Sequence, residues 1–408
     1  MGYKERMTPS SPVDAVPGLR GRGFALLIAA TAVGLCGFAA VLPLVPLWAV
    51  RGGAGEFGAG STTAAFMLTT VLTQLAMPRM LEHGGYRWAF PVGSLIMGLP
   101  APLFALSTDL APLITVSAIR GVGFGMVSVA GTALAARLVP PEQVGRATGY
   151  YGLAVGLPQV VILPGGVALA LDIGFDTAFW LTGLCSLAGA ALSAGIWFAD
   201  GGRNRPLLRP ARNGAPKAGR GASLAGPLVL MLLTASSAGA VFTFIAVPLS
   251  GTPWLVTASL AGYAALVVVG RWSAGSSYDR YGRTLLLLPG MAAAVCGTAV
   301  IAVGLWGPVG WVPVGAALFG LGFGAVQNET VTLMLNRAGP AGQGRASAVW
   351  NIGYDAGAGA GAMALGLFIQ ALGYGPAFAA LAVALTAALP LARVVAEVLF
   401  QGVRIPWL

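Results

Sequence analysis

Long apolar runs alternate with short polar segments along almost the whole 408-residue chain. A run of about 20 apolar residues is long enough to cross a bilayer as a helix, and lipid offers its backbone no other hydrogen-bond partner. The pattern predicts an all-α integral membrane protein with twelve transmembrane helices, at residues 23–49, 58–78, 88–107, 111–136, 146–171, 176–198, 226–249, 254–274, 284–306, 311–335, 346–372 and 375–396.

Two short patterns recur at one fixed spacing and divide these helices into halves. Gly121-Val-Gly-Phe-Gly125 recurs as Gly320-Leu-Gly-Phe-Gly324, and Gly145-Arg-Ala-Thr148 recurs as Gly344-Arg-Ala-Ser347, each 199 residues later. Two matches at one offset predict parallel repeats of six helices, with a substrate path along their interface. The predicted organisation is an N-terminal tail (1–22), a first bundle (23–200), a linker (201–225), a second bundle (226–398) and a C-terminal tail (399–408).

Composition excludes most other classes of protein. The chain is 57% hydrophobic and 9% charged, whereas soluble proteins carry roughly 25% charged residues. The net charge of +10 does not indicate nucleic-acid binding, because most basic residues lie singly or in pairs between apolar runs. Three distant cysteines and one histidine offer little material for a disulfide framework, a metal site or a catalytic triad. We therefore expect no enzymatic activity, no metal and no cofactor.

The distribution of basic residues predicts the orientation in the membrane. With a cytoplasmic N-terminus, 21 of the 23 basic residues fall in cytoplasmic segments, Arg51 lies on the opposite face and Arg120 lies inside the fourth helix. This bias predicts a multi-pass protein of the inner (plasma) membrane with both termini cytoplasmic. The linker has six basic residues and no acidic ones, which favours a flexible connector. Contact of this linker with anionic lipid headgroups is the alternative.

A charged motif between the eighth and ninth helices suggests a family. It reads Gly275-Ser-Ser-Tyr-Asp279-Arg280-Tyr-Gly282-Arg283 and resembles the loop signature of the major facilitator superfamily. The resemblance implies a conformational latch, in which glycines permit a tight turn and Asp279 can cap a helix N-terminus and pair with a basic residue. The equivalent first-half loop departs from the pattern, with Glu82 and Arg87 as the candidate latch residues. Two merely charged turns are the alternative.

Two further motifs favour proton coupling. Arg120 begins Arg-Gly-Val-Gly-Phe-Gly, which is similar to the fourth-helix signature of proton-coupled members of that superfamily, and a charge inside a span is functional by default. The fifth helix loosely resembles the glycine-proline motif of bacterial drug:proton antiporters and efflux permeases, through Gly152, Gly156, Pro158, Pro164, Gly165 and Gly166. Close helix packing is the alternative explanation for these small residues.

Two acidic residues lie deep in the spans and are the candidate proton carriers. Glu329 is in the tenth helix and Asp355 in the eleventh, at depths that differ by only about 5 Å, so we expect them to line one cavity. Low dielectric disfavours a charged carboxylate, which predicts proton exchange at Glu329 or Asp355, with Arg120 tuning it. The alternative is a structural network of these groups with Asn328 and Asn351.

Polar and aromatic residues beside these carboxylates are the candidate cavity lining. Asn351 and Asp355 are four residues apart and share one face of the eleventh helix. Tyr151 and Trp350 occupy matching places in the two repeats. The predicted substrate cavity is lined by Gln327, Asn328, Trp350, Asn351, Tyr354 and Tyr151. Glycines at 353, 357, 359 and 361 predict either close approach of a neighbouring helix or a bend in this one.

These observations predict a secondary transporter that works by alternating access, and the family resemblance implies a monomer. The favoured activity is proton-coupled efflux of a small organic compound, such as a drug or secondary metabolite. The partners are then a small-molecule substrate, protons and the lipid bilayer, without nucleic acid. The first alternative is a proton symporter or facilitator that imports a sugar or another metabolite. A non-transporting membrane sensor or scaffold is the alternative from another class.

Overall fold

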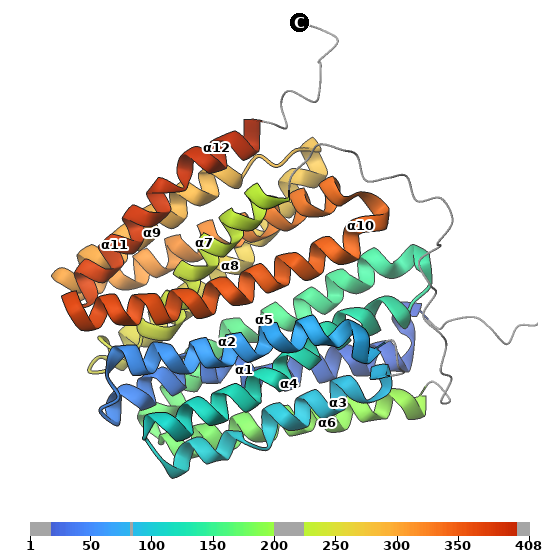
Figure 1. Cartoon of the computed structure of the whole chain (residues 1–408), viewed down its shortest axis with the longest axis horizontal. Coiled ribbons are helices and arrows are strands. Elements are labelled where there is room, and N and C mark those ends of the chain that lie inside the picture. The colour runs from blue at the N-terminus through green and yellow to red at the C-terminus, as the bar shows by residue number, and fades with distance from the viewer. Residues whose placement is uncertain (1–17, 82–84, 200–223, 398–408) are drawn as a thin grey trace, which may run out of the picture.

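The computed structural model describes residues 18–81, 85–199 and 224–397. These residues are almost entirely helical and form two groups of helices that lie side by side (Figure 1). The first group contains α1 (Arg22–Arg51), α2 (Gly55–Met80), α3 (Tyr86–Gly98), α4 (Leu110–Arg137), α5 (Val144–Asp172) and α6 (Phe175–Ala199). The second contains α7 (Ala225–Phe244), α8 (Pro253–Tyr281), α9 (Leu287–Trp306), α10 (Val312–Leu372), α11 (Tyr374–Ala387) and α12 (Leu389–Glu397). Glu82, most of the linker and most of both tails lie outside the described residues.

The element α10 contains both the tenth and the eleventh predicted spans. Its backbone leaves the helical conformation at Gly339, with φ 64° and ψ 174°, a conformation that glycine adopts readily because it has no Cβ. The break separates two spans, Val309–Gly339 and Gly342–Leu372, which we call the first and second arms of α10. Conversely, α11 and α12 form one span, Tyr374–Ala396.

Among the described residues, eleven helices are long and apolar enough to cross a membrane, and α2 is the remaining member of the predicted twelve. The helix α2 has the length but is rich in threonine and contains Gln74. Several of these polar side chains are buried, and Thr70 Oγ1 donates to the carbonyl oxygens of Phe66 and Gly121 at 2.9 and 3.0 Å. Its polar residues therefore face protein, and the predicted all-α fold of two six-helix bundles is confirmed.

The first repeated glycine motif packs α4 between α2 and α3. A Cβ at Gly121 would overlap the carbonyl oxygen of Phe66 in α2, and one at Gly123 would overlap that of Gly93 in α3. Gly125 again faces α2. Alternate glycines thus let two neighbouring backbones approach opposite sides of α4.

The second copy of the motif does the same in the other half. A Cβ at Gly320 would overlap the carbonyl oxygen of Tyr263 in α8, and one at Gly322 would overlap that of Gly290 in α9. Gly324 again faces α8. The repeated sequence pattern therefore marks equivalent three-helix packing in the two halves.

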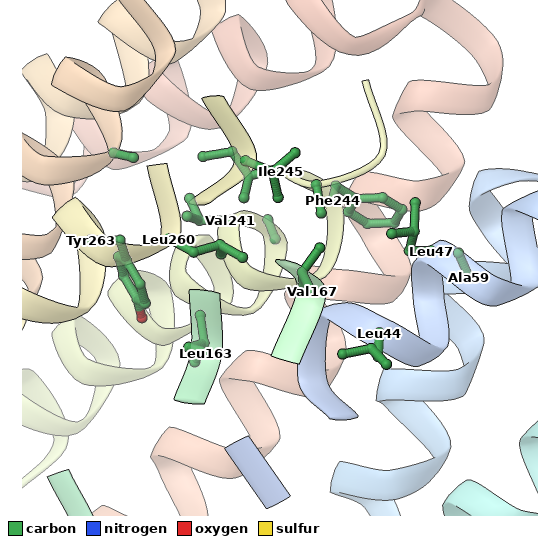
Figure 2. Packing of buried hydrophobic residues seen from close by; sticks show 14 of the residues in the cluster. Leu44, Leu47, Ala59, Leu163, Val167, Val241, Phe244, Ile245, Leu260 and Tyr263 are labelled. Carbon is green, nitrogen blue, oxygen red and sulfur yellow. The ribbon is translucent and has the colours of Figure 1, made fainter. Parts of the chain in front are cut away.

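The halves share a hydrophobic core at one end of the molecule. We call this the closed end; there α1 leads into α2 and α7 leads into α8. In Figure 2, Leu44, Leu163 and Val167 of the first half lie near Val241 and Leu260 of the second. The opposite end carries the described ends of the chain at Gly18 and Glu397, and we call it the tail end. Its buried residues include two clusters that are each confined to one half, around Leu287 and Met291 in the second half and around Phe24 and Val139 in the first.

Candidate functional site

Asp355 lies in the seam between the two halves. It belongs to the second arm of α10, is only 4% exposed, and accepts a hydrogen bond of 2.7 Å from Nε2 of Gln74 in α2. The same Gln74 nitrogen donates to Ser128 Oγ of α4 at 3.2 Å. Asp355 is therefore tied to the first half by a neutral amide, and no basic side chain of the described residues pairs with it.

Small residues bring the two helices of this seam close together. A Cβ at Gly60 of α2 would overlap the carbonyl oxygen of Ala362, and one at Gly359 would meet the Met67 side chain at 2.7 Å. Because both helices are narrow here, the short side chain of Asp355 reaches Gln74 directly. The predicted close approach at Gly359 is thus confirmed, and α2 is the neighbour.

Two further polar contacts join the halves nearer the closed end. The hydroxyl oxygens of Thr63 in α2 and Thr243 in α7 are 3.2 Å apart. The Tyr374 hydroxyl donates to Glu56 Oε1 at 3.3 Å. Together with Gln74 and Asp355, these pairs form a line of contacts along the seam.

Glu329, the second predicted proton carrier, has a different environment. It is 1% exposed, and its Oε1 accepts a hydrogen bond of 3.0 Å from the backbone N–H of Leu286. Leu286 precedes α9, so this carboxylate caps the N-terminus of that helix, where unpaired N–H groups and the helix dipole favour a negative charge. Glu329 and Asp355 therefore have partners on different helices, and the expectation that they line one cavity stays a prediction.

We expect Glu329 to matter more for stability than for coupling. Glu329→Gln keeps an oxygen for the Leu286 amide and should leave the melting temperature and proton-coupled transport close to wild type. Glu329→Leu removes the cap, which should cost about 0.5–2 kcal/mol, measured by thermal unfolding of the full chain in detergent. Glu142→Leu, at an exposed position, is the control. Loss of coupling in Glu329→Gln at an unchanged melting temperature would contradict this assignment.

Arg120 is fully buried within the first half. Its Nη2 donates to the carbonyl oxygen of Gly37 in α1 at 3.0 Å, and its guanidinium carbon lies 5.7 Å from the centre of the Phe104 ring. Its Nε and Nη1 have no hydrogen-bond partner among the described residues. Arg120 shares no hydrogen bond with Asp355 or Glu329 in this part of the chain, so its proposed influence on protonation stays a prediction.

The amides predicted to line the cavity are mostly held by backbone. Asn328 donates to the carbonyl oxygen of Arg271 in α8 at 3.1 Å, and Asn351 donates to that of Ser347 at 2.9 Å. Gln327 is 5% exposed, and its Oε1 has no partner among the described residues. Of these three amides, Asn328 and Asn351 are partly accessible and Gln327 is buried.

The aromatic residues at matching places make matching contacts. Trp350 Nε1 donates to Thr330 Oγ1 at 3.0 Å. Tyr151 lies against Gly131, where a Cβ would overlap its hydroxyl group. Positions 131 and 330 are 199 residues apart, so each aromatic ring contacts the equivalent place on the preceding long helix. Trp350 is half-buried, whereas Tyr151 is 6% exposed and packs inside the first half.

Trp350 and Tyr354 also end a run of stacked aromatic rings in the second half. Ring centres are 6.1 Å apart between Trp350 and Tyr354, 6.1 Å between Tyr354 and Phe323, and 6.4 Å between Phe323 and Tyr263. Stacking at this spacing is favourable for aromatic pairs. The run connects α8 and both arms of α10, and Trp350 and Tyr354 are its partly accessible members.

The predicted latch lies at the tail end but is not the loop expected from the sequence. The helix α8 continues to Tyr281, so Gly275, Asp279 and Arg280 are helical. Asp279 occupies the last turn of α8 and so does not cap the N-terminus of its own helix; its capping of another helix and its pairing with a basic residue stay predictions. Gly282 ends the helix with φ 64°, which is the turn glycine that the motif predicted, and Arg283 follows it. The side chain of Arg87 lies outside the described residues.

The sequence patterns did not identify the residues that make contacts between the halves, which are Gln74, Thr63, Thr243, Glu56 and Tyr374. One signal was available for Gln74, because it is an amide inside an otherwise apolar and threonine-rich span. Which helix faces Gln74 depends on the tilt and rotation of α2 against α10, which single-sequence patterns do not contain.

Comparison with known proteins places this geometry in a family. A sequence model described as Major Facilitator Superfamily matches residues 26–362. A search of curated protein sequences finds no significant match.

Solved structures with the same fold are membrane transporters rather than enzymes. The chain is similar to a POT family transporter in complex with 5-aminolevulinic acid (TM-score 0.74, 12% identity, covering 94% of this chain and 98% of that one). It is also similar to a bacterial homologue of the human lysosomal transporter Spinster in an inward-facing and unoccupied conformation (0.71, 14%, 95% and 100%). A third is the nucleoside transporter NupG (0.68, 12%, 91% and 98%). At these identities the likeness shows the fold alone.

Proposed function

Because the chain belongs to the major facilitator superfamily, we propose that it is a proton-coupled exporter of a small organic compound that works by alternating access. Membership makes it a membrane transporter of a small molecule. The proton, the outward direction and the class of compound are the proposed part.

The placement of Asp355 is the observation that carries the proposal. A buried carboxylate is costly when charged unless a cation or several donors compensate it, and Gln74 supplies one neutral donor. A proton on Asp355 removes that cost while the seam is closed. When the halves separate at Gln74, water reaches the carboxylate and the proton can leave. Movement of the halves and proton transfer are thereby linked at one residue.

The shared core at the closed end supports alternating access. If the N-terminus is cytoplasmic, as the basic residues favour, the closed end faces outward and the separate clusters face the cytoplasm. This arrangement corresponds to an inward-facing state. Export then requires the contacts along the seam to break while the tail end closes.

The fifth helix supports export over import. Close packing was the alternative explanation for its small residues, yet a Cβ at Gly152, Gly156 or Gly165 would meet nothing within 4 Å. Only Gly166 is crowded, by Ala40 of α1. Because these glycines are not needed for close packing, they favour the antiporter motif over packing as the explanation for the small residues.

The aromatic run favours a compound with a ring system. Trp350 and Tyr354 present stacked ring faces that remain partly accessible, and aromatic faces bind planar apolar groups through stacking and burial. Asn351 on the same arm adds a polar group.

The test is transport by the purified full chain in liposomes. A pH-sensitive dye is trapped inside, a pH gradient is imposed, and aromatic drug-like compounds are added, starting with ethidium. The proposal expects protons to move opposite to the compound. Movement of the compound in the same direction as protons would show symport, and movement without protons would show a facilitator; either result contradicts the proposed antiport.

A cross-link across the seam should stop transport. Thr63→Cys with Thr243→Cys, in a chain with Cys36, Cys185 and Cys296 changed to serine, places two thiols where hydroxyl oxygens are 3.2 Å apart, close enough for a disulfide. Oxidation should block transport almost completely because the closed end can no longer open. Reduction should restore it. Uptake into liposomes measures the rate before and after each treatment.

Thr63→Cys alone is the control and should be insensitive to oxidation. Cross-linking is verified by cutting a protease site inserted in the linker, since a disulfide keeps the two halves together on a non-reducing gel. A fully cross-linked protein that transports at the normal rate would contradict alternating access at this seam.

A further inference from the structure

A small pocket lies inside the first half near the closed end. It is bordered by α1, α2, α4 and the short helix η4 (Ala101–Leu106), is partly open, and has room for little more than one water-sized sphere. Most of its lining is apolar, including Phe66 and Phe104. Its polar side chains are Thr62, Thr63, Ser117 and Arg120.

The guanidinium of Arg120 is only partly satisfied in this pocket. One nitrogen donates to the Gly37 carbonyl oxygen, while Nε and Nη1 have no partner among the described residues. The Phe104 ring offers a weak electrostatic contact at 5.7 Å. No acidic side chain is among the residues that line the pocket.

The groups around Arg120 do not fully compensate its charge or its N–H donors. A guanidinium keeps its positive charge in proteins, and a charge inside an apolar span is costly unless it is paired. Buried N–H groups without partners add to that cost. One carbonyl oxygen and one ring face do not balance a full charge, so a negatively charged partner would be favourable beside Arg120.

We propose that this pocket binds one small monovalent anion, either free chloride or the carboxylate group of a solute. The guanidinium of Arg120 supplies the positive charge that attracts the anion, and the Ser117 hydroxyl lies in the same lining. The planar fork of a guanidinium suits a carboxylate, and charge-assisted hydrogen bonds are the strong ones. The apolar walls exclude a large, strongly hydrated or multiply charged ion.

The pocket also borders the seam between the halves. Thr63 is part of its lining and, at the same time, its hydroxyl oxygen lies 3.2 Å from that of Thr243 in the other half. An anion therefore reaches Arg120 through the closed end when this contact opens. The inference does not depend on proton transfer at Asp355, because anion binding is measured at equilibrium without a pH gradient.

The test is the melting temperature of the full-length protein in nanodiscs at constant ionic strength. Gluconate, which is too large for the pocket, is replaced stepwise by chloride, formate, acetate or propionate. A ligand that binds the folded state raises the melting temperature with saturation, and we expect a rise of at least about 2 °C. Arg120→Gln should abolish the rise. Arg51→Gln is the matched control, because Arg51 also lies over a phenylalanine ring, at 4.7 Å from Phe175, but is exposed.

The pattern of effective anions separates the two sources. A rise with chloride as well as acetate supports a site for a free ion, and a rise with carboxylates alone supports a site for the charged end of a solute. No saturable rise with any of these anions in the wild-type protein overturns the proposal, as does an equal rise in Arg120→Gln. If Arg120→Gln does not fold, wild-type crystals soaked in bromide decide: anomalous density beside Arg120 supports the site, and its absence there, with acetate also without effect on melting, overturns it.

Discussion

Asp355→Asn should abolish proton-driven transport while leaving the protein folded. Asparagine has nearly the same shape and still accepts the hydrogen bond from Gln74 through its side-chain oxygen, so the seam between α2 and α10 keeps its contact. It cannot carry a proton, and the link between opening of the seam and proton release is lost. We expect substrate-dependent proton flux in liposomes to fall by more than about tenfold.

Two comparisons make this result specific to coupling. Exchange of labelled for unlabelled compound across the liposome needs no net proton movement, so it should persist in Asp355→Asn. Asp172→Asn, at an exposed position at the closed end of α5, should behave as wild type. Full proton-coupled transport in Asp355→Asn would remove this residue from the mechanism and leave it a structural role in the seam.

Gly361→Ala should prevent normal folding, although it adds only one methyl group. A Cβ at Gly361 would overlap the carbonyl oxygen of Ser236 in α7, which is backbone and cannot rotate away. The second arm of α10 and α7 would have to separate, and their contact at Gly239 and Ala358 is equally tight. Overpacking of this kind costs about 1–3 kcal/mol or more.

The measurement is the yield of monodisperse protein and its melting temperature in detergent. Gly149→Ala is the matched control, because a Cβ at that position in α5 would meet nothing within 4 Å. Alanine favours a helix over glycine by roughly 0.5–1 kcal/mol, so this control should melt at the same or a higher temperature. A Gly361→Ala protein as stable as wild type would show that α7 moves aside without cost.

The number and order of the membrane-spanning helices could be predicted from the sequence. In lipid, a backbone has to form its hydrogen bonds within its own helix, so every long apolar run is helical. Every predicted span has a helical counterpart. The glycine repeats marked equivalent helices correctly, since close backbone approach favours small residues such as glycine. The glycines of the second arm were also informative: Gly361 and Gly357 face α7, while Gly359 faces α2.

The partners of the buried polar groups were not readable in the same way. Glu329 and Asp355 have similar depth and chemistry, yet one caps α9 and the other meets Gln74 of the opposite half. The difference comes from the direction in which each side chain leaves its arm of α10. That direction depends on helix rotation and on the break at Gly339, neither of which follows from hydropathy.

Secondary structure at the charged motif was misread for a related reason. Its polar residues indicated a loop after residue 274, but α8 continues to Tyr281 beyond the apolar segment. Polar residues end a membrane span without ending a helix, because water satisfies exposed side chains while the backbone hydrogen bonds continue.

The glycine triplets also have a mechanical consequence. A helix whose backbone contacts neighbours on two sides cannot bend without breaking those contacts. The helix α4, the first arm of α10 and the helices packed against them are therefore stiff. Curvature during transport is then confined to the other helices. Of these, α1 and α5 each contain two prolines within the helix, which remove backbone hydrogen bonds and ease bending. Each half thus combines a rigid wedge with helices that bend more easily.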